Sequence, residues 1–318
     1  MREVSVRKES TYTRTHSNRL IKRRRLIQNV PLLIMFFPVI LFYLIFKYVP
    51  MFGLVIAFKN YNSHDGFLGS PWVGFKYFLT IFQSPQTLAV IKNTFILSIL
   101  NVFVGFPFPI LIAILLNEVR KNWFKRSVQT MLYIPHFLSW IIVGGMITTM
   151  FSMQTGVINH IITYLFGQPY PFLYKETSWI VVYVGSGIWR DAGYSAIIYL
   201  AALTAIDSSL YEAACLDGAN KWKQVWHVTL PGISPTIFIM FILSMGRILE
   251  VGFDHVYILQ NSTVSAVSEV ISTYIYKVGL QSGQYSLTAA LGLFESVVGL
   301  LLVLMANTVA KRFNQNLW

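Results

Sequence analysis

Charged residues and cysteines are both scarce in this chain of 318 residues. Charged residues make up 12% of the sequence, whereas soluble globular domains carry roughly 25%. Hydrophobic residues make up 55%, and the mean hydropathy is +0.56. This balance indicates that much of the chain is dissolved in lipid. The single cysteine, Cys215, excludes a disulfide framework and a four-thiolate metal site.

Motifs for nucleotide binding and for hydrolysis are also absent from the sequence. Without a G-x-x-x-x-G-K-[ST] loop the chain does not hold ATP by itself. It has neither the H-E-x-x-H of zinc proteases nor the G-x-S-x-G of hydrolases. The six histidines are scattered along the sequence, and we interpret His136, beside Pro135, as a packed or interfacial side chain. We therefore expect no metal and no cofactor on this chain.

Long apolar runs are the main feature that is present. A transmembrane helix needs about 20 mostly apolar residues. The first run lacks a small-residue cleavage site and continues through two prolines, so we interpret it as an uncleaved span rather than a signal peptide. The sequence predicts an all-α membrane protein with six transmembrane helices, at 30–58, 88–117, 127–151, 178–206, 235–257 and 285–310.

The positive residues have a distribution that sets the orientation of these spans. Nine of the 25 Lys and Arg lie in residues 1–29, next to an apolar run and without a nucleic-acid-binding motif. Seventeen lie in the two termini and the alternate connections, against four in the opposite connections. The positive-inside rule therefore predicts that both termini are cytoplasmic. We expect a basic cytoplasmic tail at 1–29 and a transmembrane domain at 30–318.

Two connections on the expected outer side, 59–87 and 152–177, are rich in Gly, Pro, Ser and aromatic residues. Loops of this kind can dock a partner, or they can be simple polar connectors. Composition leaves both interpretations open.

One cytoplasmic connection, YEAACLDGANKWKQVWHVTLPGISP at 211–235, contains helix-capping signals. Asp207, Ser208 and Ser209 are candidate N-caps, and Ser209 followed by Glu212 fits a capping box. Gly218 suits the left-handed residue that ends a helix. The sequence therefore predicts two short helices joined at a glycine bend.

The second of these helices is expected over 221–229, capped by Asn220 and ended by Leu230, Pro231 and Pro235. Its residues Trp222, Val225, Trp226 and Thr229 share one face at helical spacing. The helix pair is either an interfacial hairpin with its tryptophans among the lipid headgroups or a rigid contact for a cytosolic partner.

The order Glu212-Ala213-Ala214, then Gly218, then Leu230-Pro231 resembles the EAA loop of binding-protein-dependent (type I) ABC importer permeases. Segments such as IYLAALTAID (198–207) and GFDHVYIL (252–259) are similar to permeases of the lipo-oligosaccharide and polysaccharide importers, including the alginate importer. The resemblance covers about residues 30–318.

This resemblance implies a coupling loop at 208–231 within a type I ABC importer transmembrane fold. In that family the loop forms coupling helices that insert into a cleft of the ATPase subunit. Glu212 would make a polar contact there, Ala213 and Ala214 would allow close approach, and Gly218 would form the bend. Capping and coupling are not exclusive roles for Glu212.

The resemblance also implies the assembly. The chain would form half of the path for an oligosaccharide, with an acidic one such as an alginate fragment as a candidate, in the cytoplasmic (inner) membrane of a bacterium. It would not be an enzyme, because ATP and Mg would be bound by a separate dimer of ATPase subunits. The other expected partners are a second, similar permease chain and an extracytoplasmic solute-binding protein. The residues alone leave open an ion-coupled secondary sugar transporter and a membrane enzyme acting on lipid-linked sugars.

Several ionisable residues fall inside the expected spans, where they are costly and usually face a partner or a water-filled path. In the fifth span, three of them would share one helix face. They form either an internal ion-pair network or the polar lining of a sugar path, with Tyr194 contributing. The candidates are Arg190, Asp191, Tyr194, Arg247, Glu250, Asp254 and Glu295.

Overall fold

The computed structural model describes residues 29–312, which belong to two compact units divided between Val55 and Ile56. The basic tail expected at 1–29 lies outside the described residues except for Asn29. In the first unit a helix begins at Asn29. It includes the π-helical turn η1 (Leu44–Tyr48) and α2 (Val49–Met51), and runs on through the 3-10 helix η2 (Phe52–Phe58), which crosses the unit boundary. Asn29–Phe58 is 30 residues long and apolar enough to cross a membrane.

The second unit contains three further helices that are long and apolar enough to span a bilayer. The first, Pro85–Glu118, consists of α5 (Pro85–Leu100), η3 (Asn101–Gly105) and α6 (Pro107–Glu118). The second, Lys221–Gly246, consists of α12 (Lys221–Gln224), η5 (Val225–Thr229) and α13 (Leu230–Gly246). The third is α17 (Tyr285–Lys311).

Two bent helix pairs complete the set of candidate spans. The helix α10 (Glu176–Thr204) turns by 73° into α11 (Ser208–Leu216). The helix α7 (Asn122–Tyr133) continues into η4 (Ile134–Phe137) and then bends by 102° into α8 (Trp140–Met150). The described residues therefore contain four candidate spans, or up to six if each bent pair is one span.

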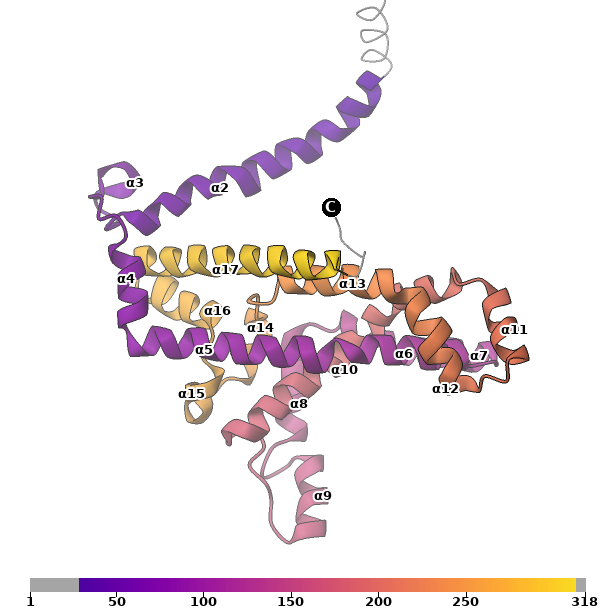
Figure 1. The fold of residues 1–318 in the computed structure, drawn as a ribbon. Helices are drawn as coiled ribbons and strands as arrows, with labels where there is room; N and C mark the ends of the chain where they lie inside the picture. Colours follow the sequence, from indigo (N-terminus) through magenta and orange to yellow (C-terminus); the bar gives the residue numbers. More distant parts are fainter. Residues whose placement is uncertain (1–28, 313–318) are drawn as a thin grey trace, which may run out of the picture. The chain divides into compact units, whose positions relative to one another are not determined.

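The remaining elements of the second unit are short. They are α3 (Gly66–Gly69), α4 (Lys76–Gln83), α9 (Val157–Phe166), α14 (Phe253–Leu259), η6 (Ser262–Val264), α15 (Ser265–Ser268), α16 (Ile271–Tyr274) and η7 (Ile275–Gln281). Figure 1 shows α5, α6, α13 and α17 running in nearly the same direction, with α11 and α12 at one end and α4 at the other.

The expected third span, 127–151, is not one continuous helix, because the helical segment Asn122–Phe137 and α8 meet at an angle of 102°. Pro135 has no N–H and cannot continue the α-helical hydrogen bonds. A new helix then starts at Trp140, where the Ser139 hydroxyl accepts the Ile142 N–H at 3.4 Å. The third apolar run is therefore two helices at a large angle.

The expected fifth span, 235–257, is displaced along the chain. The helix already begins at Lys221 and continues through Pro231, which follows directly on the π-helical turn η5. Pro235 frees the carbonyl of Pro231, and the Ser234 hydroxyl donates to that carbonyl at 2.8 Å. The prediction that these prolines end the preceding helix is therefore wrong. The helix ends instead at Gly246, because Arg247 leaves the helical conformation (φ −113°, ψ 14°).

The long helix α10 lies at the centre of the packing in the second unit. It packs on α6 and α13 through a buried cluster of Ala113, Ala196, Tyr199, Leu203 and Ile233. At Gly193 it approaches α7 so closely that a Cβ would lie 2.2 Å from the Leu132 carbonyl oxygen. A movement of α10 would therefore displace α6, α7 and α13, because all three pack directly against it.

Candidate functional site

The connection between α10 and α13 forms two capped helices. The Asp207 carboxylate accepts the Ser209 N–H at 2.9 Å and caps α11. The predicted capping box of Ser209 and Glu212 is wrong, because the helix begins one residue earlier, at Ser208. The bonds from Ser209 hold the pKa of Asp207 below its usual value, so this cap is ionised at neutral pH. Among the described residues the Glu212 carboxylate has no hydrogen-bond or ion-pair partner, and it is exposed.

Gly218 forms the bend between these helices. Its φ of +73° lies in the left-handed region, which is costly for residues with a Cβ. The Ala219 N–H donates to the Ala214 carbonyl at 2.9 Å across the bend. The Asn220 side chain then accepts the Lys223 N–H at 2.9 Å and caps α12, as the sequence predicts. The direction of the chain is thus set on both sides of the glycine.

Side-chain hydrogen bonds hold the two helices of this pair against each other. The Tyr211 hydroxyl lies 3.0 Å from the Thr229 hydroxyl. The Gln224 amide donates to the Ala219 carbonyl at 3.0 Å and to the Cys215 sulfur at 3.1 Å. Because these bonds join α11 to α12 and η5, the pair can move as one body.

A salt bridge joins this pair to the rest of the second unit. Lys221 Nζ lies 2.9 Å from Glu118 Oε2 at the end of α6. A groove of about 680 Å³ lies beside this bridge. It is lined by Asn117, Glu118, Arg120, Tyr211, Glu212, Cys215, Leu216, Lys221 and Gln224.

Large apolar side chains are exposed on the same helix pair. Leu216 is 90% exposed, Trp222 74% and Trp226 64%. Thr229, predicted on the face of the two tryptophans, is buried instead. The π-helical turn η5 (Val225–Thr229) adds a residue to one turn and so changes the helix face. Exposed apolar residues gathered in this way mark a contact with a partner or a membrane.

A second site, a cavity of about 370 Å³, lies within the second unit between η3, α8, α10, α13 and α14. Asp191, one of the residues predicted for a sugar path, lines it together with Tyr199. Asn101, Tyr183, Ser195, Ser244 and His255 add polar groups to its wall. The cavity therefore combines aromatic surface with hydrogen-bonding groups.

The predicted residues Arg190, Asp191 and Tyr194 are brought together with His136 near this cavity. Asp191 Oδ1 lies 2.9 Å from Arg190 Nη1 and 2.8 Å from His136 Nδ1. The His136 ring stacks on Tyr194 at 4.0 Å between centroids. Arg190 Nε also donates to the Leu138 carbonyl at 3.1 Å. His136 is thus packed, as the sequence indicates. It also links η4, where the helix bends, to α10.

A column of stacked rings extends from Arg190 along α10. Its guanidinium lies over Trp140 (4.5 Å), Trp140 stacks on His255 (3.6 Å), and His255 stacks on Tyr183 (4.2 Å). Tyr183 stacks in turn on Trp179 at 5.4 Å. Sequence reasoning missed Trp140 and His255, because α8 and α14 supply them from distant parts of the chain. The one signal in the sequence was the helical spacing of Trp179, Tyr183 and Arg190, which places them on one face of α10.

The other predicted path residues do not join this cluster. Arg247 and Glu250 are exposed in the turn after α13, Asp254 is exposed on α14, and Glu295 is half-buried on α17. The prediction that the first three share one helix face is wrong, because the helix ends before them. None of the four lines the 370 Å³ cavity, and none forms an ion pair with another described residue.

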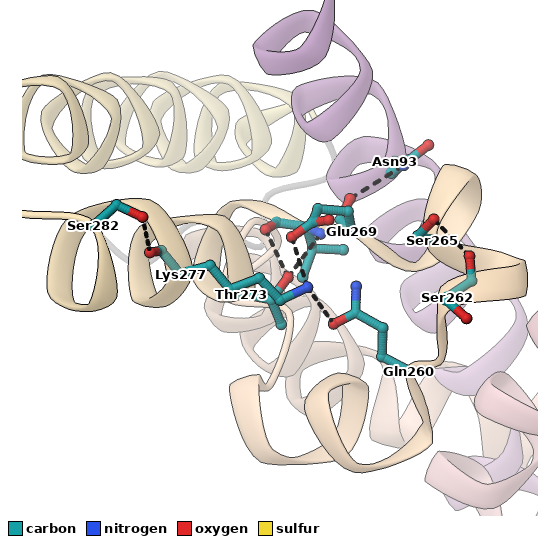
Figure 2. Close-up of polar contacts among 9 residues, drawn as sticks. Asn93, Gln260, Ser262, Ser265, Glu269, Thr273, Lys277 and Ser282 are labelled. Atoms are coloured by element: carbon teal, nitrogen blue, oxygen red, sulfur yellow. Dashed lines mark hydrogen bonds and ion pairs between the residues drawn. The ribbon is translucent and has the colours of Figure 1, made fainter. Parts of the chain in front are cut away.

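A third cluster of polar side chains is found at the α4 end of the second unit (Figure 1 and Figure 2). Lys277 Nζ donates to Glu269 Oε1 and to Gln260 Oε1, each at 3.0 Å. The Asn93 amide donates to the carbonyls of Ala266 and Glu269. The Lys277 bonds hold the 260–277 segment together, and the Asn93 bonds fasten it to α5. Within residues 29–312 no group of three or more His, Cys, Asp or Glu side chains is arranged to hold a metal ion.

Comparisons with known proteins match almost the whole chain. The sequence model of a family described as "Binding-protein-dependent transport system inner membrane component" matches residues 105–316. The polygalacturonan/rhamnogalacturonan transport system permease protein YteP of Bacillus subtilis (strain 168) is 47% identical over 298 residues, which are 92% of this chain and 93% of that protein.

Two solved structures have the same fold. One is a bacterial ABC transporter involved in the import of the acidic polysaccharide alginate, with a TM-score of 0.84 and 41% identity over 91% of this chain and 98% of that chain. The other is a bacterial alginate ABC transporter in complex with an alginate pentasaccharide-bound periplasmic protein. Its TM-score is 0.85 and its identity 40%, over 92% of this chain and 98% of that chain.

Proposed function

This chain belongs to the family of binding-protein-dependent transport system inner membrane components, and on that basis we propose that it is the membrane permease of an ABC importer for an acidic oligosaccharide. It has the type I ABC importer permease fold. Family membership favours this function over the ion-coupled secondary transporter and the membrane enzyme that the residues alone left open.

The proposed substrate class follows from the relatives and suits the cavity. YteP is named for polygalacturonan and rhamnogalacturonan, and the two solved transporters handle alginate. All of these polymers contain uronic acids. Saccharides are commonly held by aromatic surface and hydrogen bonds, and the 370 Å³ cavity offers both from Phe106, Tyr199 and Ser195. We assign this cavity to one half of the translocation path, with Asp191 in its wall.

The proposed motor contact is the helix pair at 208–231. Leu216, Trp222 and Trp226 are exposed there, and the Glu212 carboxylate has no described partner. The ATPase subunit would cover the apolar residues and pair with Glu212, while Ala213 and Ala214 would allow close approach. Leu230 and Pro231 continue this body directly into α13. Displacement of the pair would therefore be passed to both α10 and α13.

The orientation and the partners follow from this assignment. With the helix pair on the cytoplasmic side, both termini are cytoplasmic, and 30–318 is the transmembrane domain of a chain in a bacterial cytoplasmic membrane. A dimer of ATPase subunits would bind ATP and Mg, and an extracytoplasmic binding protein would deliver the sugar. A second, similar permease would complete the path. It would cover Arg247, Glu250 and Asp254, whose exposure at membrane depth is otherwise costly, while Glu295 would face the path from α17.

The test is uptake by the complete transporter reconstituted in liposomes with its binding protein. We expect uptake of uronic-acid oligosaccharides to require ATP inside the liposomes, and neutral oligosaccharides of the same length to be taken up at least about tenfold more slowly, which corresponds to about 1.4 kcal/mol of discrimination. Uptake driven by an ion gradient without ATP would contradict the importer. Equal uptake of neutral sugars would contradict the acidic substrate only.

A further inference from the structure

The helix α4 (Lys76–Gln83) has an orientation unlike that of the spans. Figure 1 shows it crossing the ends of α5 and α17, at the opposite end of these helices from α11 and α12. A helix perpendicular to the spans, at their end, lies in the plane of the membrane surface. This end corresponds to the outer leaflet if α11 and α12 are cytoplasmic, so the leaflet rests on the proposed function.

One face of α4 is packed on the spans. Ile81 is completely buried, in a cluster that contains Val90 of α5 and Leu291 of α17. Tyr77 and Phe78 pack against the same cluster. This face fixes α4 to the ends of both long helices.

The neighbouring face of α4 is apolar and uncovered. Phe75 is 68% exposed, Leu79 61% and Phe82 54%, at i, i+4 and i+7 spacing. Trp72, 64% exposed, lies just before the helix and stacks on Phe58 at 5.8 Å. Burial of large apolar side chains is favourable, so a row of four is not expected to face solvent.

The geometry points to lipid as the cover, and we propose that residues 72–82 form an anchor in the outer membrane–water interface. Phe82 contacts Phe294 of α17 edge-on at 5.5 Å. From Phe294 the exposed apolar residues of α17 continue along the helix through Val297 and Leu301. The apolar face of α4 is thus continuous with a surface that runs along a span, where lipid chains are the solvent.

The composition of this anchor fits the interface rather than the bilayer centre. Tryptophan and other aromatic residues concentrate at the headgroup level, and amphipathic helices lie there with their apolar face about 5–10 Å deep. The polar residues Lys76 and Gln83 are exposed beside the apolar row and reach the headgroups. The anchor therefore sets the depth of the outer ends of α5 and α17.

An environment-sensitive fluorescent amino acid makes a direct test possible without changing Cys215. It is introduced by codon reassignment at Leu79 or at Phe75, and at Lys76 as the matched polar-edge control. The complete transporter is placed in nanodiscs whose lipids carry a nitroxide either near the headgroup or near the acyl-chain end. Iodide serves as the water-soluble quencher. ATP-driven uptake by each labelled variant, reconstituted in parallel in liposomes, confirms that it is folded.

At positions 75 and 79 we expect quenching by the headgroup-proximal nitroxide to exceed that by the deep nitroxide by about twofold, with little quenching by iodide. At position 76 we expect iodide to quench more strongly. Strong iodide quenching at 75 and 79 that disappears only when the binding protein is added would overturn the proposal and identify a docking surface instead. Protection from every quencher would also overturn it, because protein would then cover the face. Uptake and depth are separate readouts, so failure of the anchor is distinguishable from failure of the importer assignment.

Discussion

Replacing Gly218 with valine is expected to reduce ATP-driven uptake at least tenfold while leaving the chain folded. Gly218 has a φ of +73°, and the left-handed region costs a residue with a Cβ roughly 1–2 kcal/mol, more when it is β-branched. The bend must therefore strain or open, and α11 and α12 lose the relative direction that Asp207 and Asn220 cap on either side. The measurement is uptake together with the amount of ATPase subunit that co-purifies with the chain.

The chain supplies a matched control in Gly283. It has a φ of +72° and, like Gly218, would place an added Cβ more than 4 Å from every neighbouring heavy atom, but it lies just before α17, away from the helix pair. Gly283→Val carries the same backbone cost and should keep the ATPase bound. Gly218→Asn should recover part of the activity, because asparagine tolerates the left-handed region. Equal loss of the ATPase in both valine variants would show that backbone strain, and not the coupling bend, is responsible.

The second large effect is expected at Asp191. Asp191→Asn removes the negative charge that lies between Arg190 and His136. The Arg190 side chain is only 16% exposed, and breaking a buried ion pair by removing one partner costs about 3–5 kcal/mol. Because the Asp191 side chain is 41% exposed, solvent reduces this cost. We expect a lower melting temperature and at least a tenfold loss of uptake, since η4 loses its charged link to α10.

A double-mutant cycle separates pairing from a general defect. Arg190→Gln combined with Asp191→Asn leaves no unpaired charge, so its melting temperature should lie above that of Asp191→Asn alone. Glu176→Gln, at an exposed carboxylate on the same helix without a described ion pair, should change neither quantity. Strict additivity of the two substitutions would contradict the ion pair as the source of the effect.

The apolar spans and the glycine bend could be predicted from sequence because both are local properties. Span length and hydropathy are carried by contiguous residues, and Gly218 and Asn220 act on their nearest neighbours. The helix through Pro231 and Pro235 was not predictable, because it involves the extra residue in η5 before Pro231 and the Ser234 hydroxyl, which donates to the carbonyl that Pro235 leaves free. Propensity alone favours a helix end there.

The intramembrane site was only partly predictable for a different reason. Charge within an apolar run identifies Arg190 and Asp191, because such residues are costly in lipid. His136, Trp140 and His255 complete the site only through tertiary packing, and nothing near them in the sequence marks a site. The same limit explains the error at Arg247, Glu250 and Asp254, where a helical face was assumed beyond the residue at which the helix ends.

The most direct test of the proposed motor contact uses the only cysteine of the native chain. Cys215 is exposed and lines the groove beside Glu212, so a thiol-reactive photo-crosslinker attached there reports what covers the helix pair in the host membrane. We expect one dominant adduct, with a protein whose sequence contains the G-x-x-x-x-G-K-[ST] loop of an ATPase. Adducts with lipid alone, or with no nucleotide-binding protein, would contradict the assignment of 208–231 as the motor contact.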